Sequence, residues 1–172
     1  MSVIESKTRW AVRPGPGKEG PFCAVAPDGT EHGPFENWSD ASSKASEENS
    51  AIYEGELKQR GCEVADVLLA LKARGATRVS SEYSGSGDDG EFQRLVVAGT
   101  RATAEERNTI EWYFDELLQW RYSGWENSEG GQGEFEVDLT CEPVTLEHTH
   151  NECVETYDTT NHSDELRPQV KG

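Results

Sequence analysis

The sequence predicts an α+β fold: an antiparallel β-sheet covered by two helices and preceded by a small β-β-α unit. Three observations lead to this prediction. Apolar residues recur at three- and four-residue spacing over 63–74 and 104–122, which is typical of amphipathic helices. Apolar and polar residues alternate over 77–99 and 134–149, which is typical of hairpins with one buried face. Short extended segments separated by turn residues occupy 9–35.

Residues 1–55 form the predicted β-β-α module. Two extended segments, RWAVR and PFCAVA, flank the breaker-rich PGPGKEGP, and the second runs into the turn Pro27-Asp28-Gly29. A third short extended segment, TEHGPF, precedes a helix that Ser39 or Asp40 can cap and that continues to about Asn49. Residues 50–61 are expected to be a connector, because Gly55 and Gly61 interrupt them.

Residues 56–150 form the predicted sheet domain, with the element order αββαββ. A helix over 63–74 ends at Gly75, and a Gly-rich turn at 85–90 joins strands ATRVSSEYSG and EFQRLVVAG. Thr103 and Glu106 form a capping box at the start of the helix 104–122. Strands EFEVDLT and VTLEHTH follow a loop, WENSEGGQG. Residues 151–172 are expected to be an acidic, flexible C-terminal segment, with one further strand near Tyr157 as the alternative.

The chain is strongly acidic, with 33 Asp and Glu against 16 Lys and Arg in 172 residues and a net charge of −17. No Lys or Arg lies between Arg121 and Arg167, whereas twelve carboxylates do. This charge disfavours direct binding of nucleic acid through its phosphates. The sequence also lacks a long apolar run and an apolar stretch near its start, so we expect a cytoplasmic protein that does not bind membranes.

Several chemical classes find little support. The GSGDDG segment resembles a nucleotide loop, but it joins two strands and its carboxylates would repel phosphate, so a tight hairpin turn is expected instead. No nucleophile motif is present, and we expect neither catalytic residues nor a cofactor. His148, His150 and Cys153 could lie near one another as metal ligands, although unrelated surface histidines are the simpler interpretation. Trp112, Trp120 and Trp125 could form a binding platform or cap the core.

Two motifs in order, GSGDDGEF at 85–92 and GWENSEGGQGEFEVDLT at 124–140, are separated by the capped helix. This arrangement resembles an uncharacterised family of small acidic proteins borne by phages and plasmids, over roughly residues 62–150. The resemblance implies no activity. It implies a setting in mobile elements, where evasion of host defence is a common task.

The leading functional hypothesis is a non-enzymatic inhibitor of anti-CRISPR or anti-restriction type that mimics nucleic acid. Its carboxylates would occupy the basic groove of a host nuclease or another nucleic-acid-binding protein or complex. The residues expected to bind that partner are Asp88, Asp89, Glu91, Trp125, Glu126, Glu129, Glu134, Glu136, Asp138 and Glu147. The alternatives are a divalent-cation module or metal-dependent enzyme that uses the acidic loops, and a structural or regulatory phage protein, for which a homodimer and an exposed Trp125 would be indicators.

Overall fold

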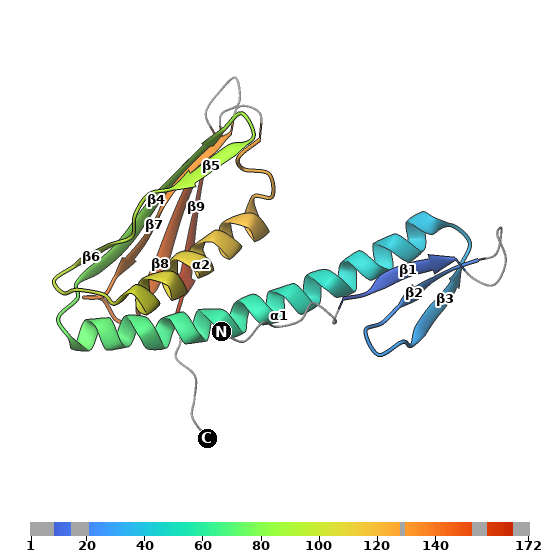
Figure 1. Cartoon of the computed structure of the whole chain (residues 1–172), viewed down its shortest axis with the longest axis horizontal. Coiled ribbons are helices and arrows are strands. Elements are labelled where there is room, and N and C mark those ends of the chain that lie inside the picture. Colours follow the sequence, from blue (N-terminus) through green and yellow to red (C-terminus); the bar gives the residue numbers. More distant parts are fainter. Residues whose placement is uncertain (1–8, 15–20, 128–129, 153–157, 167–172) are drawn as a thin grey trace. The chain divides into compact units, whose positions relative to one another are not determined.

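A computed structural model describes residues 9–14, 21–127, 130–152 and 158–166 (Figure 1). The chain divides into two compact units, Met1–Glu56 and Leu57–Gly172, and each is described by itself. No helix in the described part of the chain is long and apolar enough to span a membrane.

The first unit contains a three-stranded antiparallel sheet, with strands β1 (Ala11–Pro14), β2 (Phe22–Val25) and β3 (Glu31–Phe35) in that spatial order. The first part of helix α1 (Trp38–Ala73) completes the predicted β-β-α arrangement. Ala24 and Val25 of β2 are buried, as are Ala41 and Ala45 of α1, so the small side chains form the interior of this unit.

Helix α1 differs from the prediction, because the segments expected as two helices and a connector form one helix of 36 residues. Gly55 and the expected boundary after it lie inside this helix. Residues 50–61 contain mostly good helix formers, and an interior glycine costs only about 1 kcal/mol relative to alanine. Gly61 also has a packing role. A Cβ at this position would lie 3.1 Å from the hydroxyl of Tyr113, so glycine lets α1 approach the helix that carries Tyr113 closely.

The second unit contains a six-stranded antiparallel sheet. Its strands are β4 (Arg78–Ser86), β5 (Asp89–Phe92), β6 (Val96–Ala98), β7 (Gly131–Asp138), β8 (Thr145–Glu152) and β9 (Asp158–Glu165). Their order is β5-β4-β7-β8-β9, and β6 also pairs with β4. The strand expected over 91–99 is therefore two short strands. The break falls at Leu95, whose buried side chain enters the core while Glu111 accepts a hydrogen bond from its backbone N–H at 3.3 Å.

Strand β9 corrects the expectation of a flexible C-terminal segment, because residues 158–165 pair with β8 along their whole length. Polar cross-strand contacts accompany the pairing. The Ser163 hydroxyl donates to Glu147 at 2.6 Å, and the Thr149 hydroxyl donates to Asn161 at 3.0 Å. On the opposite side of the strand, both oxygens of Asp164 accept hydrogen bonds from Arg121. A polar sequence can thus form an ordered edge strand when its side chains find partners.

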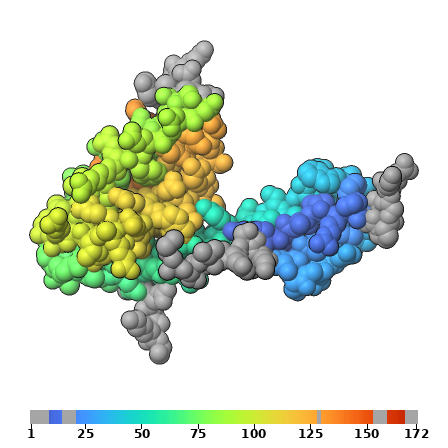
Figure 2. Space-filling view, viewed as in Figure 1, coloured from blue at the N-terminus to red at the C-terminus, as the bar shows by residue number. Residues whose placement is uncertain are grey.

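Helix α2 (Ala104–Arg121) and the second half of α1 cover one face of this sheet (Figure 1). Their apolar residues share one core with the inward residues of the strands, which include Val79, Tyr83, Phe135, Val137 and Leu146. The other side of α2 lies at the surface, in yellow to orange in Figure 2. Two tryptophans of this helix, Trp112 and Trp120, are 41% and 44% exposed. The predicted α+β class is confirmed.

The capping box at the start of α2 is confirmed, and it makes a testable contribution to stability. The Thr103 hydroxyl accepts a hydrogen bond from the Glu106 N–H at 3.2 Å, and the Glu106 carboxylate accepts one from the Thr103 N–H at 2.8 Å. We expect Thr103→Ala to lower the free energy of unfolding by about 1 kcal/mol, because the Glu106 N–H loses its acceptor, the Thr103 hydroxyl. Urea unfolding would measure the change, with Thr100→Ala outside the box as the control.

Candidate interaction surface

The face of the second sheet that points away from the helices, here called the outer face, carries the predicted acidic residues. The register places Glu91 beside Ser84, Glu134 beside Glu82, and Glu136 beside Glu147. Residues directly opposite one another in antiparallel strands point to the same side of the sheet. The outer face therefore gathers six of the predicted residues: Asp89, Glu91, Glu134, Glu136, Asp138 and Glu147.

The densest part of this face is here called the acidic strip and consists of Glu82, Glu134, Glu136, Asp138 and Glu147. Two of its cross-strand pairs, Glu82 with Glu134 and Glu136 with Glu147, bring carboxylates directly opposite each other. Such like-charged pairs destabilise a sheet. The strip therefore concentrates negative charge. This concentration makes the sheet less stable than one with uncharged polar residues at the same positions.

Arg78 partly offsets this charge at one end of the strip. Its guanidinium contacts Glu136 and lies 3.3 Å from Glu134, with the Arg78 side chain 51% exposed and the two glutamates 38% exposed each. Exposed ion pairs of this kind contribute little to stability. Their role here is to hold the two glutamate side chains on the strip.

Asp138 ends the strip in a local hydrogen-bond network. The Thr140 hydroxyl and N–H donate to one of its carboxylate oxygens at 2.6 and 2.7 Å, and the Cys141 thiol donates to the other. These bonds, chiefly the one from the Thr140 hydroxyl, lower the pKa of Asp138 below its usual range. Asp138 is therefore negatively charged at neutral pH.

Asp88 lies in the turn between β4 and β5, outside the strip. Gly87 and Asp88 both have positive φ, 64° and 70°, which is the conformation of a tight two-residue hairpin turn. The Asp88 N–H donates to the backbone oxygen of Glu126 at 3.1 Å. The GSGDDG segment is thus a hairpin turn rather than a phosphate cradle, as expected.

Trp125 is only 7% exposed, so of the two roles open to it, a binding platform or a cap on the core, the structure shows the second, and Trp125 is not available to bind a partner as predicted. Its indole packs edge-on against Tyr83 and Phe92, with ring centroids 5.3 and 6.0 Å apart. Glycines make room for it, because a Cβ at Gly85 or Gly90 would lie 2.8 or 2.6 Å from the indole ring. The glycines of the GSGDDG segment therefore also accommodate a core tryptophan.

Glu126 is half-buried beside α2, away from the outer face, and its Oε2 is enclosed with no hydrogen-bond partner among the described residues. Burial, followed by the nearby charge of Glu126, raises the pKa of Asp115. The negative charge of Glu126, in the loop after α2, therefore disfavours a negative charge on Asp115 of that helix. Glu129, also expected to bind the partner, lies outside the described residues.

Glu82 is an acidic residue of the strip that was not among the predicted partner-binding residues. It alternates along β4 with Val79, Ser81 and Tyr83, all of which are buried, so its own side chain points outward. The alternation was visible in the sequence, but the pairing of β4 with β7, which places Glu82 opposite Glu134, was not.

The inner face of the same sheet holds a buried polar network around two of the predicted metal-ligand candidates. His148 and His150 are 0% and 2% exposed, and the Tyr83 hydroxyl lies 2.8 Å from His148 Nε2 and 2.7 Å from His150 Nδ1. The interpretation of these two residues as surface histidines is therefore wrong. Cys153, the third candidate, lies outside the described residues.

Arg121 fixes the direction of the hydrogen bonds that His148 makes in this network. Its guanidinium can only donate, so His148 Nδ1, 3.1 Å away, accepts and the His148 proton is on Nε2. His148 Nε2 then donates to the Tyr83 hydroxyl oxygen. The Tyr83 hydroxyl proton has two acceptors within reach, His150 Nδ1 at 2.7 Å and the Thr149 backbone oxygen at 3.4 Å. His150 Nε2 is buried without a partner among the described residues.

Metal binding finds no support in this arrangement. Among the described residues, no group of three or more His, Cys, Asp or Glu side chains is arranged to hold a metal ion. The two acidic turns do meet, because the Asp88 N–H donates to the backbone oxygen of Glu126, but Glu134 points away from them on the outer face of β7.

Comparison with known proteins gives one match. Residues 97–164, from within β6 to the residue before the last one of β9, match the model of a family of unknown function, DUF6878. This match fits the resemblance to an uncharacterised family; it includes the motif at 124–140 and leaves the motif at 85–92 outside. No curated protein and no solved structure shows significant similarity to the chain.

Proposed function

We propose that this protein is a non-enzymatic binding protein whose outer face mimics nucleic acid and occupies the basic groove of a nucleic-acid-binding protein. Inhibition of a host nuclease or defence complex by a protein of a mobile element is the setting that we propose for it. The observation that carries the proposal is the acidic strip, in which the register of three strands gathers carboxylates at a cost to stability.

The charge density of the strip supports this proposal. Glu134, Glu136 and Asp138 alternate along β7 and so span about 13 Å, at about 6.6 Å for each two-residue step. Together with Glu82 and Glu147, and against the single charge of Arg78, the strip carries a net of four negative charges. One DNA strand carries a phosphate every 3.4 Å or so, or about four over the same length. The number of negative charges on the strip thus matches that of one DNA strand of this length, and not that of both strands of a duplex.

We expect the triple variant Glu134→Gln, Glu136→Gln and Asp138→Asn to bind its partner about tenfold more weakly. Each lost contact between exposed charges contributes up to about 1 kcal/mol, and 1.4 kcal/mol corresponds to a factor of ten. The tagged protein would be used to capture partners from a bacterial lysate with elution in rising salt. The recovered nucleic-acid-binding protein would then be titrated with DNA and with each variant.

The matched control removes the same number of charges from exposed helical positions, by Glu63→Gln, Asp66→Asn and Glu105→Gln. Three results together would support mimicry: the protein competes with DNA for the partner, this competition weakens as salt rises, and it is kept by the control but lost by the strip variant. Equal loss in both triple variants would show that only the net charge matters. Binding that does not compete with DNA would contradict the proposal.

A further inference from the structure

A groove that the proposed function does not use lies between α1 and the end of β9. It consists of two adjoining hollows of about 280 and 430 Å³, which share Glu165 and Leu166 in their walls. The α1 residues that line them recur every three or four positions from Lys58 to Leu69, so one face of the helix forms a continuous wall.

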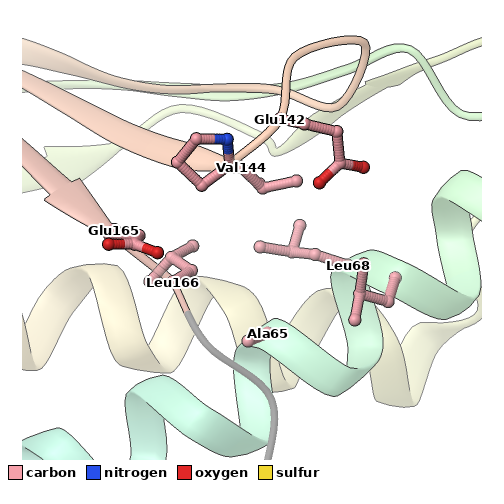
Figure 3. A pocket seen from close by; sticks show the side chains of 8 residues that line it. Ala65, Leu68, Glu142, Val144, Glu165 and Leu166 are labelled. Atoms are coloured by element: carbon pink, nitrogen blue, oxygen red, sulfur yellow. The ribbon is translucent and has the colours of Figure 1, made fainter.

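The first hollow is apolar at its base (Figure 3). Ala65 and Leu68 of α1 face Val144 and Leu166 across it, while Glu142 lies at its rim. A volume of about 280 Å³ is at the lower end for small-molecule pockets. The hollow is therefore suited to one inserted aliphatic side chain.

The second hollow is more polar and lies further along the same face of α1. Lys58 and Cys62 line it together with Tyr113 and Asp164. The rim charges of the groove are partly balanced, because Lys72 contacts Glu142 at 2.5 Å and Arg121 holds Asp164. Shape and apolar contact should therefore decide which side chain the first hollow accepts. The negative net charge of the chain favours positively charged residues on either side of that side chain in the bound segment.

Strand β9 borders the groove and is the last strand of the sheet. Among the described residues, no strand pairs with its outer edge. The Leu166 N–H donates to the Val144 backbone oxygen at 3.1 Å, on the side of β8. Because backbone groups alternate between the two sides of an antiparallel strand, those of Asn161 and Ser163 face the open edge. This edge can accept another extended chain.

We infer that the groove binds an extended segment of a partner protein, which pairs with the edge of β9 and inserts an aliphatic side chain between Leu68 and Val144. Strand addition supplies backbone hydrogen bonds, and the hollow supplies selectivity for the inserted side chain. Lysines on either side of that residue fit the acidic surroundings. The inference does not rest on the proposed function, because no residue of the acidic strip lines the groove.

The probe is the fluorescent peptide KTVLVTK, titrated against the full chain and followed by anisotropy. We expect saturable binding that weakens about tenfold when the central leucine is replaced by serine, since the apolar contact is lost. Methylation of backbone nitrogens on the side that pairs with β9 should weaken binding similarly. The bound peptide should also slow alkylation of Cys62, which lines the groove, more than that of the exposed Cys141.

Two matched variants of α1 locate the site. Ala65→Leu fills the first hollow and should weaken binding about tenfold, whereas Ala70→Leu, at an exposed position outside the groove, should leave it unchanged. Circular dichroism would establish that both variants fold. No binding at about 1 mM peptide, equal binding of the serine peptide, or equal binding to Ala65→Leu would each overturn the inference. Loss of binding only in the acidic strip variant would also overturn it, while leaving the proposed function intact.

Discussion

Acidification from pH 7 to pH 5 should lower the free energy of unfolding of the second unit by about 2 kcal/mol through His148 alone. His148 is fully buried, and this burial lowers its pKa to about 3, with smaller contributions from the charges of Arg121, His150 and His162. Burial also lowers the pKa of His150, against the opposing effect of Glu152. The two histidines are neutral in the folded protein at neutral pH.

The sign follows from the protons bound in each state. The unfolded chain takes up a proton at His148 near pH 6.5, whereas the folded chain does so only near pH 3. Stability is therefore complete above pH 6.5 and is lost progressively as the pH falls toward 3. Between pH 7 and 5 most carboxylates remain charged in both states, so the histidines dominate this window.

Urea unfolding at pH 7, 6 and 5, followed by circular dichroism, would measure this effect. His148→Gln should be less stable at pH 7, because Arg121 and Tyr83 lose a partner, but its stability should depend less on pH. The control is His32→Gln, since His32 is exposed and the variant should keep the full dependence. A flat profile in the unmodified chain, or the same slope in His148→Gln, would contradict the role assigned to His148.

Elements with a strong local pattern could be predicted from the sequence. The helix over 104–122 and its capping box are encoded within a few residues, as is the alternation of Phe135, Val137 and Leu139 with acidic residues. Boundaries that depend on distant partners could not be predicted. Gly61 lies inside α1, where it packs on Tyr113 of α2. Residues 158–165 form a strand because they pair with β8 and because Arg121 donates hydrogen bonds to Asp164.

The candidate surface shows the same division. Alternation along β7 was enough to place Glu134, Glu136 and Asp138 on one side of the strand, but register decided what lay beside them. Trp125 stands at the start of a loop rich in polar residues, so nothing local indicated that its indole would be buried against Tyr83. His148 and His150 alternate with polar residues on the side of Val144 and Leu146, which pointed toward the core, but histidine is common on both faces of a strand, so residue type alone did not indicate burial.

Gly133→Ala should be the most destabilising of the single substitutions considered, with a loss of about 3 kcal/mol or more in the free energy of unfolding. A Cβ at this position would lie 2.0 Å from the backbone oxygen of Thr149 and 2.4 Å from the Tyr83 hydroxyl. Neither atom can move freely. The first belongs to β8, which pairs with β7, and the second is held between His148 and His150.

The control is Gly55→Ala, in the interior of α1, where an added Cβ has no heavy atom within 4 Å. This change should stabilise the chain by up to about 1 kcal/mol, because alanine favours a helix more than glycine does. Urea unfolding at pH 7 would compare both variants, and NMR would show whether the Tyr83 hydroxyl keeps its two partners in Gly133→Ala. If Gly133→Ala is as stable as the unmodified chain, Gly133 does not provide the room that the tyrosine and histidines occupy. A large loss of stability, together with displaced histidine resonances, would instead show that the buried network requires glycine at position 133. This requirement would account for a glycine-rich segment that looks like a loop in the sequence but forms the start of β7.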